Sequence, residues 1–300
     1  MKTLINVAVI VCLLSCESVP AQALVNKEYF QWIKGEFEVP EEIKKKTTVD
    51  GLQFFLDSKN EFTRMAAVRR LGEIQGPNSI EPLRAIFAKE PIPKGLHAVP
   101  LVKLEIVRRL GTIGTEQAKT ALLGILNDYW QRGSNIKDDN SSRVDHRDFT
   151  AVIPLLLKTL YRWSGDEDVF KAVETIALSE DVKNLYRGRN NIGQRAWEVY
   201  LKGIMIRKGI QEEKDSAIYM LDFIEDIGPL HIDSNGLGPL KTAAACAILE
   251  RLNQATLSSL ISEFEDKFKK EPLDPKGFFT ERHNKLRNKI GTMKKIPRVL

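Results

Sequence analysis

The feature that most constrains this chain is a seven-residue pattern that occurs twice. The residues from Val68 to Ile74 are Val-Arg-Arg-Leu-Gly-Glu-Ile, and those from Val107 to Ile113 are Val-Arg-Arg-Leu-Gly-Thr-Ile. Six of the seven residue types agree, at a spacing of 39 residues. A period between about 20 and 50 residues is typical of repeat proteins, whose units bury their apolar faces only by stacking on one another. The pattern therefore predicts an array of similar units.

Each copy lies in a segment with helical periodicity. Around the first copy, apolar residues recur at every third position, which keeps them on one side of a helix over this length. They are Met65, Val68, Leu71 and Ile74. Gly76 to Ser79 should end this helix, with Ser79 capping a second helix whose inner face carries Ile80, Leu83, Ile86 and Phe87. The segment is thus predicted to form a pair of amphipathic helices.

The glycine inside each copy needs a separate explanation. Glycine in a helix costs up to about 1 kcal/mol relative to alanine. Because Gly72 recurs as Gly111, we expect a neighbouring helix to approach closely at both positions.

The second copy begins another predicted pair, from Val99 to Trp130. Its first helix carries Leu101, Leu104, Val107, Leu110 and Ile113, and its second carries Ala118, Ala121, Leu122, Ile125 and Leu126. Gly114 should close the first of these helices. This pattern resembles the HEAT-repeat family, particularly its short bacterial form, with the best match at residues 62–130. The resemblance implies an α-solenoid of antiparallel helix pairs and a role as a protein-binding scaffold.

Three further pairs are predicted beyond residue 130, and there the Leu-Gly-x-Ile element is missing. The apolar stripes of these three pairs lie at residues 152–176, 197–224 and 240–268. In the third pair of the chain, the acidic residues after Gly165 should begin the second helix. We therefore predict an all-α fold, an α-solenoid of about five helix pairs at residues 24–270, preceded by a signal peptide.

The first 23 residues have the properties of that leader. Lys2 precedes an uncharged run from Leu4 to Cys16 that is 13 residues long, shorter than the roughly 20 needed to span a bilayer. Ala21-Gln22-Ala23 predicts cleavage between Ala23 and Leu24. Alternatively, Leu13 to Cys16 resembles a bacterial lipobox, with lipidation of Cys16. The sequence thus predicts export to the periplasm or medium, or an envelope lipoprotein, with no transmembrane span in the mature chain.

Sequence motifs of catalysis and metal binding are missing. The four histidines are at least 49 residues apart, and no HExxH or CxxC occurs. Cys246 is the one cysteine beyond the leader, and its apolar neighbours are typical of a buried thiol. We therefore predict no catalytic, cofactor-binding or metal-binding residues.

The C-terminal residues 271–300 are predicted to form a basic tail. From Lys267 to Leu300 there are 11 Lys or Arg residues against three acids, net +8 in a chain of net +5. Such a run either faces solvent or binds an anionic envelope surface.

Two functional classes remain. The first is a protein-binding scaffold or adaptor in the bacterial cell envelope, without catalysis and with its partner on the solenoid surface. The alternative is an enzyme of phycobilin-lyase-like type that holds a small substrate in its groove. Export argues against that enzyme and against nucleic-acid binding. An enclosed pocket would favour the enzyme, and an open face the scaffold.

Overall fold

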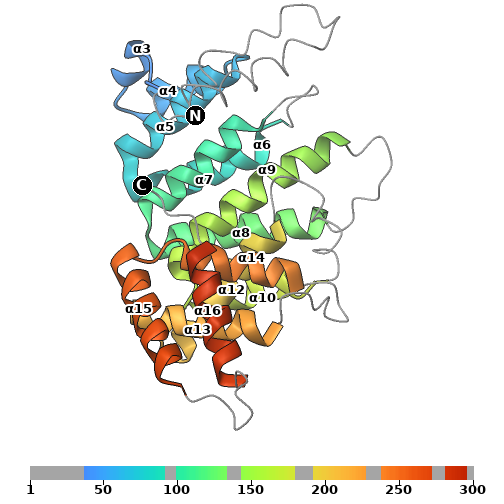
Figure 1. Ribbon diagram of the computed structural model, residues 1–300. Helices are drawn as coiled ribbons and strands as arrows, with labels where there is room; N and C mark the ends of the chain where they lie inside the picture. Colours follow the sequence, from blue (N-terminus) through green and yellow to red (C-terminus); the bar gives the residue numbers. More distant parts are fainter. Residues whose placement is uncertain are drawn as a thin grey trace, which may run out of the picture. The chain divides into compact units, whose positions relative to one another are not determined.

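The structure is a computed structural model that describes residues 37–91, 99–133, 143–179, 192–227, 238–271 and 281–295. Every regular element in these segments is a helix (Figure 1), which confirms the predicted all-α class. The predicted leader, with Cys16, Ala23 and Leu24, lies outside the described residues. The chain divides into two compact units, residues 1–70 and 71–300.

The first unit contains α3 (Glu41–Lys44), α4 (Val49–Leu56) and most of α5 (Glu61–Gln75). The hydroxyl of Thr48 caps α4 by accepting the backbone N–H of Gly51. Arg69 donates to the carbonyl oxygen of Phe37 at 2.6 Å, with its guanidinium 5.2 Å from the centre of that ring. Arg70 donates to the carbonyl of Lys46 at 3.1 Å. The first copy of the Arg-Arg pair therefore holds the preceding chain against α5.

The second unit contains the remaining helices. They are η1 (Gly76–Ser79), α6 (Ile80–Lys89), α7 (Leu101–Ile113), α8 (Glu116–Gly133), α9 (Arg143–Leu160), η2 (Tyr161–Trp163), α10 (Glu167–Ala177), α12 (Ile192–Arg207), α13 (Glu213–Ile227), α14 (Gly238–Leu249), α15 (Gln254–Lys270) and α16 (Glu281–Lys295). None of the described helices is both long enough and apolar enough to cross a membrane.

Alternate helices of this unit contact one another. In one row, α7 contacts α9, α9 contacts α12 and α12 contacts α14. In another, α6 contacts α8, and α8 contacts α10. Helix α7 has neighbours in α6, α8 and α9, and every residue from Leu101 to Val107 is buried. The core thus extends along these rows of helices.

Two of the predicted helix boundaries are confirmed and one is wrong. Gly114 ends α7 in the left-handed conformation, at φ 67°, and Asp166 caps α10 with its side chain. Ser79 does not cap α6. Its hydroxyl donates to the carbonyl of Gly76 at 2.6 Å, because η1 runs directly into α6 and leaves Ser79 in a helical conformation.

The predicted close approaches at the two repeated glycines are confirmed. A Cβ atom at Gly72 would lie 3.0 Å from the Arg109 side chain, and one at Gly111 would lie 2.4 Å from the Thr159 methyl group of α9. Thr159 is further held by its hydroxyl, which donates to the carbonyl of Leu155 at 2.8 Å. Gly111 therefore lets α9 approach α7.

Gly111→Ala should lower the free energy of unfolding by about 1–3 kcal/mol, because the added methyl group overpacks this contact. Gly291 in α16 is the matched control, since a Cβ there meets nothing within 4 Å. Gly291→Ala should raise stability by up to about 1 kcal/mol through helix propensity. Urea unfolding of both variants checks the pair. A Gly111→Ala protein as stable as Gly291→Ala would show that the contact is loose.

Part of the predicted basic tail packs against other helices of the second unit. Helix α16 contacts α13 and α15, and its Met293 is buried. Lys289 forms ion pairs with Asp222 and Glu225, and Lys294 pairs with Glu265 at 2.6 Å. Some of the cations in this segment therefore have intramolecular partners.

Candidate interaction surface

A groove lies between α6 and α8. Its volume is about 310 Å³. Its lining consists of Glu81, Arg84, Ala85, Phe87, Ala88, Gly124, Ile125, Asp128 and Arg132. Ala85 and Ala88 are one turn apart on α6 and lie opposite Gly124 in this lining, so small residues leave the space open. The groove exists because the residues at these three positions have a small side chain or none.

Phe87 is the aromatic residue in the lining of this groove, and Tyr129 packs behind it. Phe87 is buried and meets Tyr129 edge to face, with 5.4 Å between ring centres. The guanidinium of Arg132 lies 4.8 Å from the centre of the Tyr129 ring, a cation–π geometry. These contacts give this part of the groove an apolar, well-packed surface.

The charges around the groove are balanced. Arg84 pairs with Glu81 at 3.0 Å, and both side chains are exposed. Asp128 and Arg132 contribute one charge of each sign. An apolar lining with a mixed polar border is typical of a protein-binding surface, where a few apolar anchors supply most of the affinity.

A buried polar cluster lies behind Phe87 and Tyr129. Lys103 of α7 donates to Asp148 of α9 at 2.9 Å, and the Tyr129 hydroxyl donates to the same carboxylate oxygen at 2.7 Å. The Lys103 and Asp148 side chains are only 5% and 7% exposed. Burial and the neighbouring Asp148 carboxylate raise the pKa of Tyr129, which keeps its hydroxyl proton available for donation. The cluster joins α7, α8 and α9 beneath the groove.

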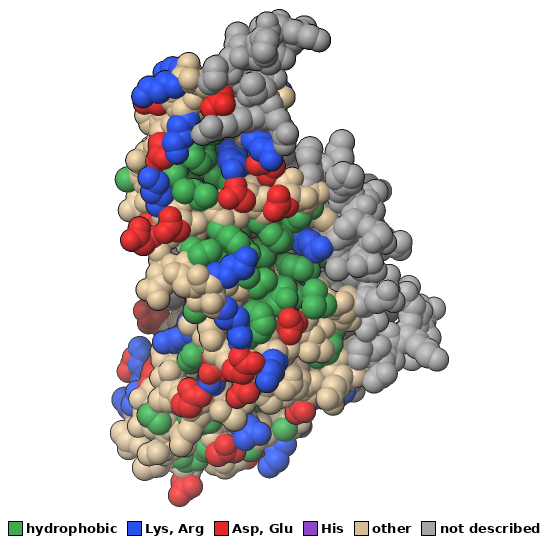
Figure 2. All heavy atoms as spheres, turned by 90° about the horizontal axis from the view of Figure 1, so that it is seen from below, with side chains coloured by type: hydrophobic (Ala, Val, Ile, Leu, Met, Phe, Trp, Pro, Cys, Tyr) green, Lys and Arg blue, Asp and Glu red, His purple; other side chains and the backbone are tan. Residues whose placement is uncertain are grey.

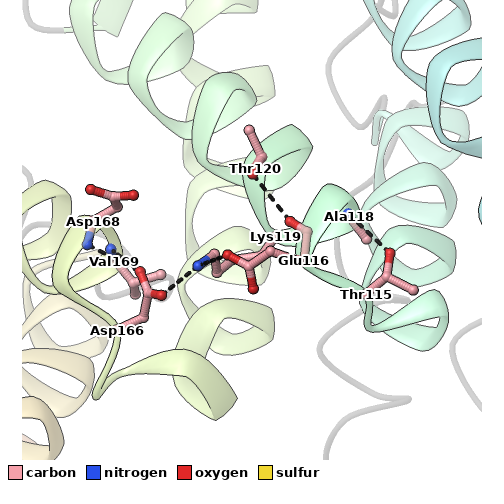
Figure 3. A network of polar contacts seen from close by, with 8 residues as sticks. All are labelled: Thr115, Glu116, Ala118, Lys119, Thr120, Asp166, Asp168 and Val169. Atoms are coloured by element: carbon pink, nitrogen blue, oxygen red, sulfur yellow. Dashed lines mark hydrogen bonds and ion pairs between the residues drawn. The ribbon is translucent and has the colours of Figure 1, made fainter.

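A second network joins the starts of α8 and α10 (Figure 3). Asp166 accepts the backbone N–H groups of Asp168 and Val169, and its other oxygen binds the buried ammonium of Lys119, which also pairs with Glu116. Burial acts to raise the pKa of Asp166, but the hydrogen bonds from Lys119, Val169 and Asp168, together with the charge of Lys119, outweigh it and hold this pKa below its usual value. The network fixes α8 and α10 relative to each other.

Figure 2 shows one face on which hydrophobic side chains gather in the middle, with Lys, Arg, Asp and Glu side chains among and around them. Apolar areas bordered by charge are found at surfaces that bind other proteins.

Groups with catalytic chemistry are sparse among the described residues. His97 and His231 lie outside them, and the side chains of His146 and His283 are not described. Within the described part of the chain, no three His, Cys, Asp or Glu residues are grouped to hold a metal ion. Burial, followed by the charge of Glu250, raises the pKa of the Cys246 thiol, so its thiolate form is disfavoured.

Sequence reasoning located parts of this surface but not the groove. The periodicity placed Phe87 and Ile125 on inner helix faces, and both are buried. It did not single out Ala85, Ala88 and Gly124 as the residues that leave space. The available signal was the occurrence of small residues one turn apart on α6.

Comparison with known proteins agrees with part of this description. A family model for the PBS lyase HEAT-like repeat matches residues 63–89, which cover most of α5, together with η1 and all of α6. No curated protein and no solved structure matches the chain. The matched segment includes the first copy of the seven-residue pattern and one wall of the groove. The chain therefore contains a HEAT-like repeat at residues 63–89, within an all-helical set of described residues.

Proposed function

We propose that this protein is a non-catalytic scaffold that binds another protein through the groove between α6 and α8. The observation that carries the proposal is the groove itself, an open surface lined by Phe87, Ile125 and small residues, with balanced charges at its border. An extended or helical segment of a partner would place one apolar side chain against Phe87 and Ile125. The HEAT-like repeat at residues 63–89 supports this, since helical repeats commonly present binding surfaces between neighbouring units.

The same proposal includes a solenoid architecture and export. The row of contacts from α7 through α9 and α12 to α14 supports a solenoid, because each pair packs on the next. The 13-residue apolar run and Ala21-Gln22-Ala23 support a cleaved leader. In this view the partner is a protein of the cell envelope, and the basic C-terminal segment adds attraction to an anionic surface.

Ala88 is the position from which to test the groove, because it lines the groove and its side chain is exposed. A photo-crosslinking residue at position 88, introduced in intact cells, should give an adduct of defined mass. The purified partner should then bind Ala88→Arg about tenfold or more weakly, because the long side chain fills the groove. The N-terminal residue of this protein in the purified adduct shows where the leader was cleaved. We expect it to be Leu24.

Thr120 is the matched control on α8, since it is exposed and does not line the groove. A crosslinker at this position should give no such adduct, and Thr120→Arg should bind the partner normally. If the Ala88→Arg and Thr120→Arg proteins bind the partner equally well, the groove is not the binding site. If the N-terminal residue is instead a blocked, lipidated Cys16, the chain is processed as a lipoprotein and not cleaved after Ala23. If Met1 is intact, the chain is not exported through a cleaved leader.

A further inference from the structure

A cationic cluster surrounds Tyr161, on elements that take no part in the groove. The Lys202 ammonium of α12 lies 4.0 Å from the centre of the Tyr161 ring, and the Arg251 guanidinium lies 4.8 Å from it. Tyr161 belongs to η2, and Arg251 lies just beyond the end of α14. Three successive parts of the fold therefore bring their side chains to one place.

The carboxylate in this cluster is already engaged. Glu198 is buried, and it pairs with Arg195 at 2.8 Å and also with Arg251. Gln194 donates to it at 3.1 Å. Across the described segments, no carboxylate pairs with Lys202. Arg195 and Arg251 share the Glu198 carboxylate, and Lys202 adds a further positive charge next to Arg251.

The position of Lys202 disfavours its own charge. Partial burial, followed by the charge of Arg251, lowers the pKa of its ammonium group. The group donates to the carbonyl of Tyr161 at 3.3 Å, and an ammonium has three donors, so two remain. An unneutralised, half-buried cation beside a guanidinium is costly for stability alone, and such arrangements are concentrated at functional sites.

We propose that Lys202 and Arg251 form a binding site for a phosphate group. A phosphate monoester carries about −1.5 to −2 charges at neutral pH, opposite in sign to the two cations at Tyr161. Lysine serves as a compact point charge toward phosphate oxygens, and arginine offers paired donors. The Arg251 side chain is 39% exposed, so a ligand can reach it from solvent. The bound anion would separate the two cations and supply the counterion that Lys202 lacks.

The test compares melting temperatures of the full chain in sodium phosphate and in sodium chloride at equal ionic strength. Wild-type protein should melt higher in phosphate, because a ligand that binds only the folded state stabilises it. Lys202→Met should lose most of this rise, and its affinity for inorganic phosphate in calorimetry should fall about tenfold. Arg251→Gln provides a second variant in case Lys202→Met folds poorly.

Lys208→Met is the matched control, because Lys208 also lies over a tyrosine ring, 4.8 Å from that of Tyr219, but is exposed and outside the cluster. This variant should keep the full phosphate-dependent rise. The proposal fails if wild type shows no rise, if both lysine variants lose it equally, or if acetate at the same ionic strength produces it. Titration with glycerol 3-phosphate separates the sources. Tighter binding than inorganic phosphate assigns the site to an organic monoester, and equal binding assigns it to the free ion.

Discussion

Leu110→Asp should abolish cooperative unfolding or lower the free energy of unfolding by more than about 4 kcal/mol. Leu110 is completely buried on α7, which packs against α6, α8 and α9. The substitution removes an apolar side chain whose loss costs about 2–5 kcal/mol, and it adds a charge without a partner, which costs several more. These losses are comparable with the 5–15 kcal/mol that hold a typical domain folded. Circular dichroism during heating measures the effect.

Thr112→Asp provides the control on the same helix, two residues further along. Thr112 is exposed, so its replacement should change stability by less than about 1 kcal/mol, mostly through a negative charge near the helix C-terminus. Leu71→Asp should repeat the effect of Leu110→Asp, since Leu71 is the matching residue of the first copy and is also fully buried. A Leu110→Asp protein that melts like wild type would mean that α7 is not part of the core.

The sequence allowed the helices to be predicted because their signals are local. Apolar residues three or four apart specify a buried face without knowledge of the partner helix. Gly114 and Asp166 similarly act within one turn of their own helices, and both were predicted correctly. Ser79 was predicted wrongly because a serine before a helix caps it only in an extended conformation, and the preceding 3-10 turn prevents that conformation.

Features that depend on distant residues could not be predicted. Lys103 and Glu105 alternate with apolar residues on α7, yet both are buried because helices surround α7. The partner of Glu105 is Arg109, one turn away, whereas the partner of Lys103 is 45 residues away on α9. No spacing rule connects the latter two positions. The groove is equally non-local, because Ala88 leaves space only when Gly124 lies opposite.

The buried pair of Lys103 and Asp148 gives the second large effect. Lys103→Met should lower the free energy of unfolding by about 3–5 kcal/mol, because it leaves the Asp148 carboxylate charged in the core without its cation. The other oxygen of that carboxylate is buried and has no hydrogen-bond partner among the described groups, so within the described residues the Tyr129 hydroxyl is left as its donor. Urea unfolding of the single variant measures the cost.

The triple variant Lys103→Met, Tyr129→Phe, Asp148→Leu separates the value of the pair from the penalty of breaking it. Replacing a complete buried ion pair by apolar side chains is often neutral or stabilising, and Tyr129→Phe removes the hydroxyl that would otherwise lose its acceptor. The triple variant should therefore recover to within about 2 kcal/mol of wild type. A triple variant as unstable as Lys103→Met would instead show that the ion pair itself stabilises the packing of α7, α8 and α9. Lys103 lies close to the rings of Phe87, which lines the groove, and of Tyr129. The same variant therefore tests whether the position of Phe87 depends on the charges behind it or only on the volume of the side chains there.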